Sequence, residues 1–283
     1  MNILKEKLRR REKFFLGGAH DVLSSKIIEN SGFDGVWLSG LGVSVTKKGL
    51  PDASIITPTE VGEICFNITS STDIPVIIDM DSGYGNSTNA YYYAREFEKC
   101  GAMGVCVEDN IFPKCNSFYN AENKALESID SMVGKIKAIR SAVSEDFCVI
   151  ARCEGLIVGL PKEEVQKRCI AYVNAGADAL VIHTSDWNKL IDFLDTWDGD
   201  IPLVVIPTKI PEVSQKTLLK YFDIIIYANQ LLRASIKASE LVMRKILNEG
   251  LSLEVESSIS SMEEVFVYNQ MAQLTELENE YLK

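Results

Sequence analysis

Residues 76–81 read VIIDMD, and residues 104–109 read GVCVED. Each run is continuously apolar, rich in β-branched residues, and closes on acidic side chains. Unbroken apolar runs of this length are typical of parallel strands that are covered on both faces. Six more runs of this kind occur, at 14–18, 35–40, 148–154, 179–184, 202–207 and 224–229. The sequence therefore predicts eight parallel strands.

The segments between these runs carry the signals of helices. Thr57, Pro58 and Glu60 form a capping box with proline at the first helical position, which predicts a helix start there. Apolar residues also recur at helical spacing over 129–143 and over 165–173. Strands that alternate with helices, without a linker-like tract, favour one (β/α)8 TIM barrel over a doubly wound sheet. We expect residues 1–283 to form this single domain.

Residues 251–283 are predicted to be a helical extension of the barrel. Ser261 and Glu264 mark a capped start, and apolar side chains then recur up to Tyr281 as in one amphipathic helix. Packing on its own barrel and packing on another protomer are equally compatible with this periodicity.

The overall composition excludes some classes of protein. The chain has 29 Lys and Arg against 40 Asp and Glu, a formal charge of −11, which repels nucleic acid and anionic membranes. No apolar run approaches the roughly 20 residues of a bilayer-spanning helix, and the first residues lack a secretory signal. The seven cysteines are scattered without a CxxC pair, which favours reduced thiols. We expect a soluble, cytoplasmic protein.

Acidic residues close two neighbouring strands at the end where the active site of such a barrel lies. Asp79 and Asp81 are two apart on the third predicted strand, so they should point the same way, with Glu108 at the same level on the fourth. Converging carboxylates repel one another unless protons or a cation relieve them, and oxygen ligands suit Mg²⁺ or Mn²⁺. The alternative is a set of loop acids or acids paired with Arg152. The adjacency of the strand ends favours a metal site.

Other polar residues at strand ends suggest anion binding. Arg152 offers a planar charged fork for a carboxylate or phosphoryl group, or a structural partner for Glu108 or Glu154. His183 closes a strand and is a candidate ligand contact, whereas His20 is interpreted as structural. The segment 110–126 is long for a strand-to-helix loop, which indicates a lid or, alternatively, a surface loop.

With these features in place, the sequence resembles the phosphoenolpyruvate mutase branch of the isocitrate lyase superfamily over nearly its whole length. The matching motifs are VWLSGLGVS at 36–44, DMDSGYGN at 79–86, VEDNIFPKCNS at 107–117, IARCE at 150–154, ADALVIH at 177–183 and IYANQLLRAS at 226–235. The resemblance implies a barrel with a swapped C-terminal helix, assembled as a homodimer or homotetramer.

The resemblance also implies an isomerase that interconverts phosphoenolpyruvate and phosphonopyruvate with Mg²⁺, forming a carbon–phosphorus bond in phosphonate biosynthesis. Asp79 would be the direct Mg²⁺ ligand, with Asp52, Asp81 and Glu108 holding its waters. The amides of Gly40 and Leu41 would bind the substrate carboxylate beside Trp37 and Ser39. The phosphoryl group would be surrounded by Arg152, His183, Ser39 and Asn116, with Lys114 on the closing loop. Ser117 would also bind the substrate.

Two features depart from the family pattern. The signature EDK, five residues, NS here reads Glu108-Asp109-Asn110 and, five residues later, Asn116-Ser117, so asparagine replaces lysine. The segment 39–52 is also one residue longer than usual. Related phosphonopyruvate hydrolases carry Thr where Asn116 stands, so Asn116 favours the mutase over hydrolysis to pyruvate and phosphate.

Two further interpretations remain. The carbon–carbon lyases of the superfamily use a catalytic cysteine in a KRCGH-like segment, but Cys115 lies one position early and lacks the Gly-His pair. Lyase action on a methylisocitrate-like or oxaloacetate-like acid is therefore the third interpretation, with Cys115 a spectator thiol. A barrel that senses a phospho-carboxylate without turnover ranks last, because the other proposed contacts keep chemically competent residues.

Overall fold

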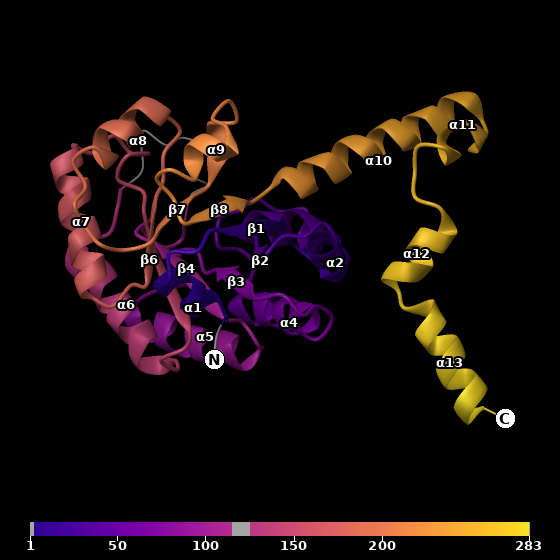
Figure 1. Cartoon of the computed structure of the whole chain (residues 1–283), viewed down its shortest axis with the longest axis horizontal. Coiled ribbons are helices and arrows are strands. Elements are labelled where there is room, and N and C mark those ends of the chain that lie inside the picture. Colours follow the sequence, from indigo (N-terminus) through magenta and orange to yellow (C-terminus); the bar gives the residue numbers. More distant parts are fainter. Residues whose placement is uncertain (1–2, 115–124, 283) are drawn as a thin grey trace. The chain divides into compact units, whose positions relative to one another are not determined.

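A computed structural model describes residues 3–114 and 125–282 and confirms the (β/α)8 barrel (Figure 1). Its strands follow the chain order around the barrel, each pair is parallel, and β8 pairs with β1. The strands are β1 (Phe14–Ala19), β2 (Gly35–Leu38), β3 (Val76–Asp79), β4 (Gly104–Glu108), β5 (Cys148–Cys153), β6 (Ala179–Ile182), β7 (Leu203–Val205) and β8 (Ile224–Tyr227). All eight coincide with the predicted apolar runs.

The helices of the barrel begin where the sequence signals predict. Thr57 Oγ1 accepts from the Glu60 amide, and Glu60 accepts from the Thr57 amide, so the capping box is confirmed. The helices are α1 (Ile3–Arg9), α2 (Val22–Asn30), α3 (Gly40–Val43), the π-helical turn η1 (Ser44–Lys48), α4 (Pro58–Thr69), α5 (Ser87–Lys99), α6 (Ile129–Ala142), α7 (Lys162–Asn174), α8 (Trp187–Leu194), the 3₁₀ turn η3 (Pro207–Lys209) and α9 (Gln215–Leu218).

Alternate strand residues fill the interior of the barrel. The buried cluster includes Leu16, Trp37, Ile77, Cys106, Ile150, Val181, Ile206 and Ile226, one from each strand or its immediate end. Leu4 and Leu8 of α1 belong to the same cluster, so α1 packs against the apolar part of the barrel. Because side chains repeat their direction every second residue, the next inward layer falls two residues later. That layer consists of Gly18, Ser39, Asp79, Glu108, Arg152, His183, Thr208 and Ala228, and its polarity marks the functional end of the barrel.

Closure of the barrel depends on a glycine in β1. A Cβ atom placed on Gly18 would lie 2.0 Å from the carbonyl oxygen of Ala228, which follows β8. Since neither backbone can move without disturbing the β1–β8 pairing, Gly18→Ala should destabilise the protein by about 3 kcal/mol or more. Urea unfolding would measure this loss. Gly32→Ala is the matched control for general glycine effects, because a Cβ there meets no atom within 4 Å, although Gly32 has a positive φ of 81°. Equal losses in the two variants would contradict the close-approach argument.

The chain divides into two compact units, Met1–Gln230 and Leu231–Lys283. The second contains most of α10 (Gln230–Glu249), and α11 (Leu253–Glu256), α12 (Met262–Tyr268) and α13 (Met271–Tyr281). The capping box at Ser261 and Glu264 is confirmed, but the single helix predicted to follow it is wrong. Gln270 adopts a left-handed conformation with φ of 59°, which separates α12 from α13. Within the described chain, none of the helices combines the length and apolar content that a membrane crossing requires.

Candidate active site

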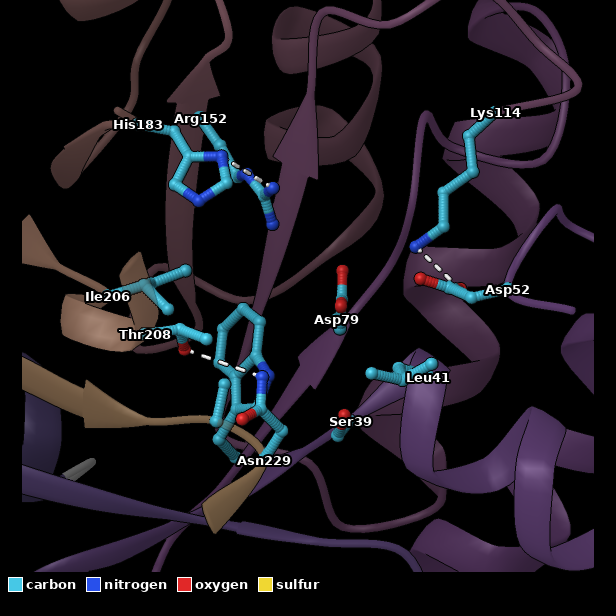
Figure 2. Close-up of a pocket in the computed structure, with 12 residues that line it drawn as sticks. Ser39, Leu41, Asp52, Asp79, Lys114, Arg152, His183, Ile206, Thr208 and Asn229 are labelled. Carbon is cyan, nitrogen blue, oxygen red and sulfur yellow. Dashed lines mark hydrogen bonds and ion pairs between the residues drawn. The ribbon is translucent and has the colours of Figure 1, made fainter. Parts of the chain in front are cut away.

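A pocket of about 520 Å³, open solvent included, lies among the polar ends of the strands (Figure 2). Eight of the predicted site residues line it: Trp37, Ser39, Leu41, Asp52, Asp79, Lys114, Arg152 and His183. These residues come from β2, β3, β5 and α3 and from segments that follow strands, so folding unites positions up to 146 residues apart in the sequence. The pocket therefore lies at the strand ends where the active site was expected.

Three carboxylates converge beside Gly40, at the start of α3. A Cβ atom on Gly40 would lie 3.2 Å from Asp81 Oδ1 and 3.6 Å from one oxygen each of Asp52 and Asp79. Lys114 is buried in the same cluster, where its Nζ lies 2.9 Å from Asp52 Oδ1 and contacts Asp81 Oδ1. The side chain of Lys114 thus offsets part of the negative charge of the cluster.

One detail of the predicted carboxylate arrangement is wrong. Strand β3 ends at Asp79, and Asp81 lies in the following turn with φ of 48°, because the backbone reverses there instead of continuing as a strand. Glu108 lies level with Asp81, as predicted for the end of the neighbouring strand, since the Glu108 amide donates to the Asp81 carbonyl over 2.9 Å. The side chain of Glu108 is held by Asn110, whose Nδ2 donates to its Oε1 over 2.8 Å. Asn110 therefore supplies a neutral donor to Glu108.

Burial and mutual repulsion shift the protonation of these acids. Burial raises the pKa of Asp81 to about 6; Asp79 and Asp52 add to the rise, and Lys114 opposes it. Burial also raises the pKa of Glu108 to about 7, despite the cations nearby. For Lys114, burial lowers the pKa, but the surrounding carboxylates together raise it well above its usual value. The cluster accordingly favours bound positive charge.

Arg152 lies opposite the carboxylate cluster and contacts two buried acids. Its Nε contacts Glu154 Oε1 and lies 3.4 Å from Glu108 Oε2, while a terminal nitrogen lies 2.9 Å from His183 Nδ1. His183 Nδ1 also lies 2.8 Å from Glu154 Oε1. Burial opposes the charge of Arg152, but Glu154 and Glu108 raise its pKa above the usual range. The guanidinium is therefore charged and held in one orientation at the pocket wall.

The start of α3 provides a site for an anionic group. Ser39 is its N-cap, and Ser39 Oγ accepts from the Gly42 amide over 3.2 Å. The amides of Gly40 and Leu41 belong to the first helical turn, where N–H groups have no partner within the helix and the helix dipole favours negative charge. The following turn η1 is π-helical, which accommodates an additional residue before Asp52. After this wide turn the chain brings Asp52 to the pocket.

The pocket contains residues that the predicted site omits. Thr208 and Asn229 line it, and Asn229 Nδ2 donates to Thr208 Oγ1 over 3.4 Å. Both residues could have been predicted from the sequence, because they lie at the ends of the seventh and eighth apolar runs. Predicted residues Asn116 and Ser117, together with Cys115, lie outside the described residues.

The donors present fit a hard divalent cation. Among residues 3–114 and 125–282, no three His, Cys, Asp or Glu side chains are placed to bind a metal ion together. Lys114 forms ion pairs with both Asp52 and Asp81. The oxygen-only donors, their convergence on Gly40 and the raised pKa of Asp81 suit Mg²⁺ or Mn²⁺ in place of a proton or an ammonium group.

The family model and a relative of known name both match this chain over most of its length. The family model described as phosphoenolpyruvate phosphomutase matches residues 4–247. The chain is 34% identical over 283 residues to the phosphoenolpyruvate phosphomutase of Tetrahymena pyriformis, covering 99% of this chain and 94% of the relative.

Two solved structures agree with this match over the whole fold. The phosphoenolpyruvate phosphomutase from Streptomyces platensis subsp. rosaceus is 36% identical, with a TM-score of 0.94 and 99% of each chain covered. A phosphonopyruvate hydrolase in complex with oxalate and Mg²⁺ is 34% identical, with a TM-score of 0.92, covering 99% of this chain and 98% of that one. The chain belongs to the phosphoenolpyruvate phosphomutase family and is an enzyme of the PEP mutase/isocitrate lyase superfamily.

Proposed function

We propose that this enzyme is a phosphoenolpyruvate mutase, which moves a phosphoryl group between the enol oxygen and carbon three of pyruvate. The observation that carries the proposal is the division of one pocket into an acidic side and a donor side. Asp52 and Asp79 lie on the acidic side, and Arg152 and His183 on the other (Figure 2). A substrate with both a carboxylate and a phosphoryl group needs a cation site beside fixed donors.

The residues of this chain would divide the substrate between them. The amides of Gly40 and Leu41 at the start of α3 would receive the carboxylate, beside Trp37 and Ser39. Asp79 would hold Mg²⁺ directly, with Asp52, Asp81 and Glu108 holding its waters, and Mn²⁺ offers the same oxygen chemistry. When bound, the cation supplies positive charge to the pyruvate oxygen atoms as negative charge develops there.

The donor side would stabilise the phosphoryl group as it changes partners. Arg152 is held by Glu154 and Glu108 and therefore needs no reorientation when charge develops on the phosphoryl oxygens. Lys114 and Asn116 would complete the enclosure and exclude water. When phosphonopyruvate reacts, the phosphorus–carbon bond breaks and a phosphorus–oxygen bond forms within the same molecule, so no water or other reactant is consumed.

Hydrolysis of phosphonopyruvate to pyruvate and phosphate is the second candidate. Asn110 favours it, because this neutral residue replaces the lysine of the mutase signature and contacts Glu108. The structural similarity to a phosphonopyruvate hydrolase also supports hydrolysis. We rank it second because Asn116 and Lys114 retain the mutase pattern.

Phosphorus NMR of the full chain with phosphonopyruvate and Mg²⁺ separates the two activities, with a chelated sample as the control. The mutase predicts that a phosphoenolpyruvate signal replaces the carbon-bonded one, and that chelation prevents this. Inorganic phosphate from the outset, with pyruvate beside it, would identify a hydrolase. A spectrum that stays unchanged would contradict both activities and direct attention to lyase substrates.

Stabilisation by Mg²⁺ should increase with pH. The pKa values of Asp81 and Glu108 are raised to about 6 and about 7, so the folded state binds more protons than the unfolded state between about pH 4 and 7. The contribution of these acids to the stability of the metal-free protein therefore falls as pH rises through this range. Mg²⁺ binds the deprotonated forms, so its binding releases protons. The Mg²⁺-induced rise in the thermal midpoint should be larger at pH 8 than at pH 5.5; equal rises would contradict this interpretation.

A further inference from the structure

Lys135 on α6 is a buried cation that the proposed chemistry does not use. The residue has no exposed surface, and it shares the inner face of α6 with the buried Met132, Ile136 and Ile139. Burying an ammonium group is unfavourable unless nearby groups replace its water. An apolar residue would serve the packing of this helix face, so the charge at Lys135 requires another explanation.

The ammonium group joins two segments that follow the acidic strand ends. Lys135 Nζ donates to the carbonyl of Ser82 over 2.6 Å and to Glu127 Oε1 over 2.5 Å. Ser82 directly follows Asp81. The Glu127 amide donates over 2.8 Å to the carbonyl of Asp109, which directly follows Glu108. Lys135 thereby connects the backbone next to Asp81 directly, and the backbone next to Glu108 through Glu127.

The turn after β3 needs such an anchor because its conformation is uncommon. Asp81 has a φ of 48°, in the left-handed region that non-glycine residues rarely adopt, and such residues persist only where their surroundings hold them. The Gly83 amide donates to the Met80 carbonyl and the Glu108 amide donates to the Asp81 carbonyl, each over 2.9 Å. Lys135 holds the next carbonyl along, that of Ser82, from the side of α6. These three contacts together aim the Asp81 carboxylate at the cluster beside Gly40.

We propose that Lys135 is a positioning residue for the divalent cation, acting through the turn that carries Asp81 and through Glu127 beside the end of β4. This inference rests on the proposed function for the presence of the cation, but it concerns affinity for the metal and not the reaction catalysed. It requires that the contact between Lys135 and the Ser82 carbonyl, and not only the neutralisation of Glu127, sets the geometry of the acids.

Two variants separate positioning from simple charge balance. Lys135→Met leaves the partly buried Glu127 without its cation, so it should lower both the thermal midpoint of the metal-free protein and the affinity for the metal. Lys135→Met combined with Glu127→Gln removes the isolated charge and should recover the midpoint. The affinity of this double variant for the metal should stay roughly 10- to 100-fold below that of the parent chain, as expected when the support of a metal ligand is lost. Lys137→Met, at an exposed position of the same helix, is the control and should change neither quantity.

Electron paramagnetic resonance of free Mn²⁺ measures the affinity of the full chain without substrate or turnover. Recovery of both the midpoint and the Mn²⁺ affinity in the double variant would overturn the proposal, because charge balance would then explain Lys135. A parent chain that binds no Mn²⁺ would overturn it as well. A parent chain that binds Mn²⁺ but leaves phosphonopyruvate unchanged would contradict only the mutase assignment, and the affinities of the variants would still decide the role of Lys135.

Discussion

Replacing Asp79 with Ala is expected to reduce turnover of phosphonopyruvate by roughly 10³-fold or more while the barrel stays folded. Asp79 ends β3 in the inward layer of the barrel, and one of its oxygens converges with Asp81 and Asp52 on Gly40. Loss of the direct ligand should remove bound Mg²⁺ from the pocket. Loss of one negative charge also relieves repulsion in the cluster, so the metal-free protein should not unfold. Steady-state kinetics at saturating Mg²⁺ and the thermal midpoint measure the two effects.

Asp73→Ala is the matched control for this experiment. Asp73 is exposed and precedes the same strand at its opposite end, so its removal changes the net charge equally without touching the pocket. Turnover by this control should equal that of the parent chain. Full activity of Asp79→Ala would refute the assignment of Asp79 as a metal ligand.

Arg152→Met is expected to lower both stability and activity. The substitution leaves Glu108 and Glu154 buried without the cation that contacts both, and the loss of one member of a buried ion pair typically costs about 3–5 kcal/mol. It also removes the charged donor from the pocket wall beside His183, so turnover should fall by roughly 10²–10³-fold. Urea unfolding and steady-state kinetics measure the two losses.

A second substitution separates the two roles of Arg152. Arg152→Met combined with Glu154→Gln leaves one buried acid fewer without a partner, so it should recover part of the stability but not the activity. Arg95→Met, at an exposed position on α5, is the control for the loss of an arginine and should resemble the parent chain. Recovery of turnover in the double variant would show that Arg152 acts only as a structural partner of these acids.

The alternation of side chains along a strand predicted the direction of Asp79 correctly, but it did not predict the conformation at Asp81. Asp79 lies two residues after the buried Ile77, and Arg152 and His183 lie two residues after the buried Ile150 and Val181. Their inward direction follows from the two-residue repeat of a strand, so the sequence predicted it. Asp81 lies a further two residues along and would point inward if the strand continued. The strand ends at Asp79, however, and Asp81 lies in a turn with φ of 48°. It still reaches the cluster, through a turn held by α6 and β4.

The sequence by itself determined the eight strands, their parallel order and most of the residues that line the pocket. The physical reason is that these properties depend on local apolar runs and on a repeat of two residues, both visible within a few positions of the chain. The resemblance to the family implied roles for Asp52 and Lys114, which no periodicity could have assigned.

Only the tertiary structure decided which charges neutralise one another. Lys114 lies between Asp52 and Asp81, Arg152 contacts Glu108 and Glu154, and Lys135 connects Ser82 with Glu127. Partners such as Lys135 and Ser82 are 53 residues apart. Such pairs form because closing the barrel brings separate strand ends together and removes them from water, and a buried charge must then find whichever opposite charge or carbonyl the fold places beside it.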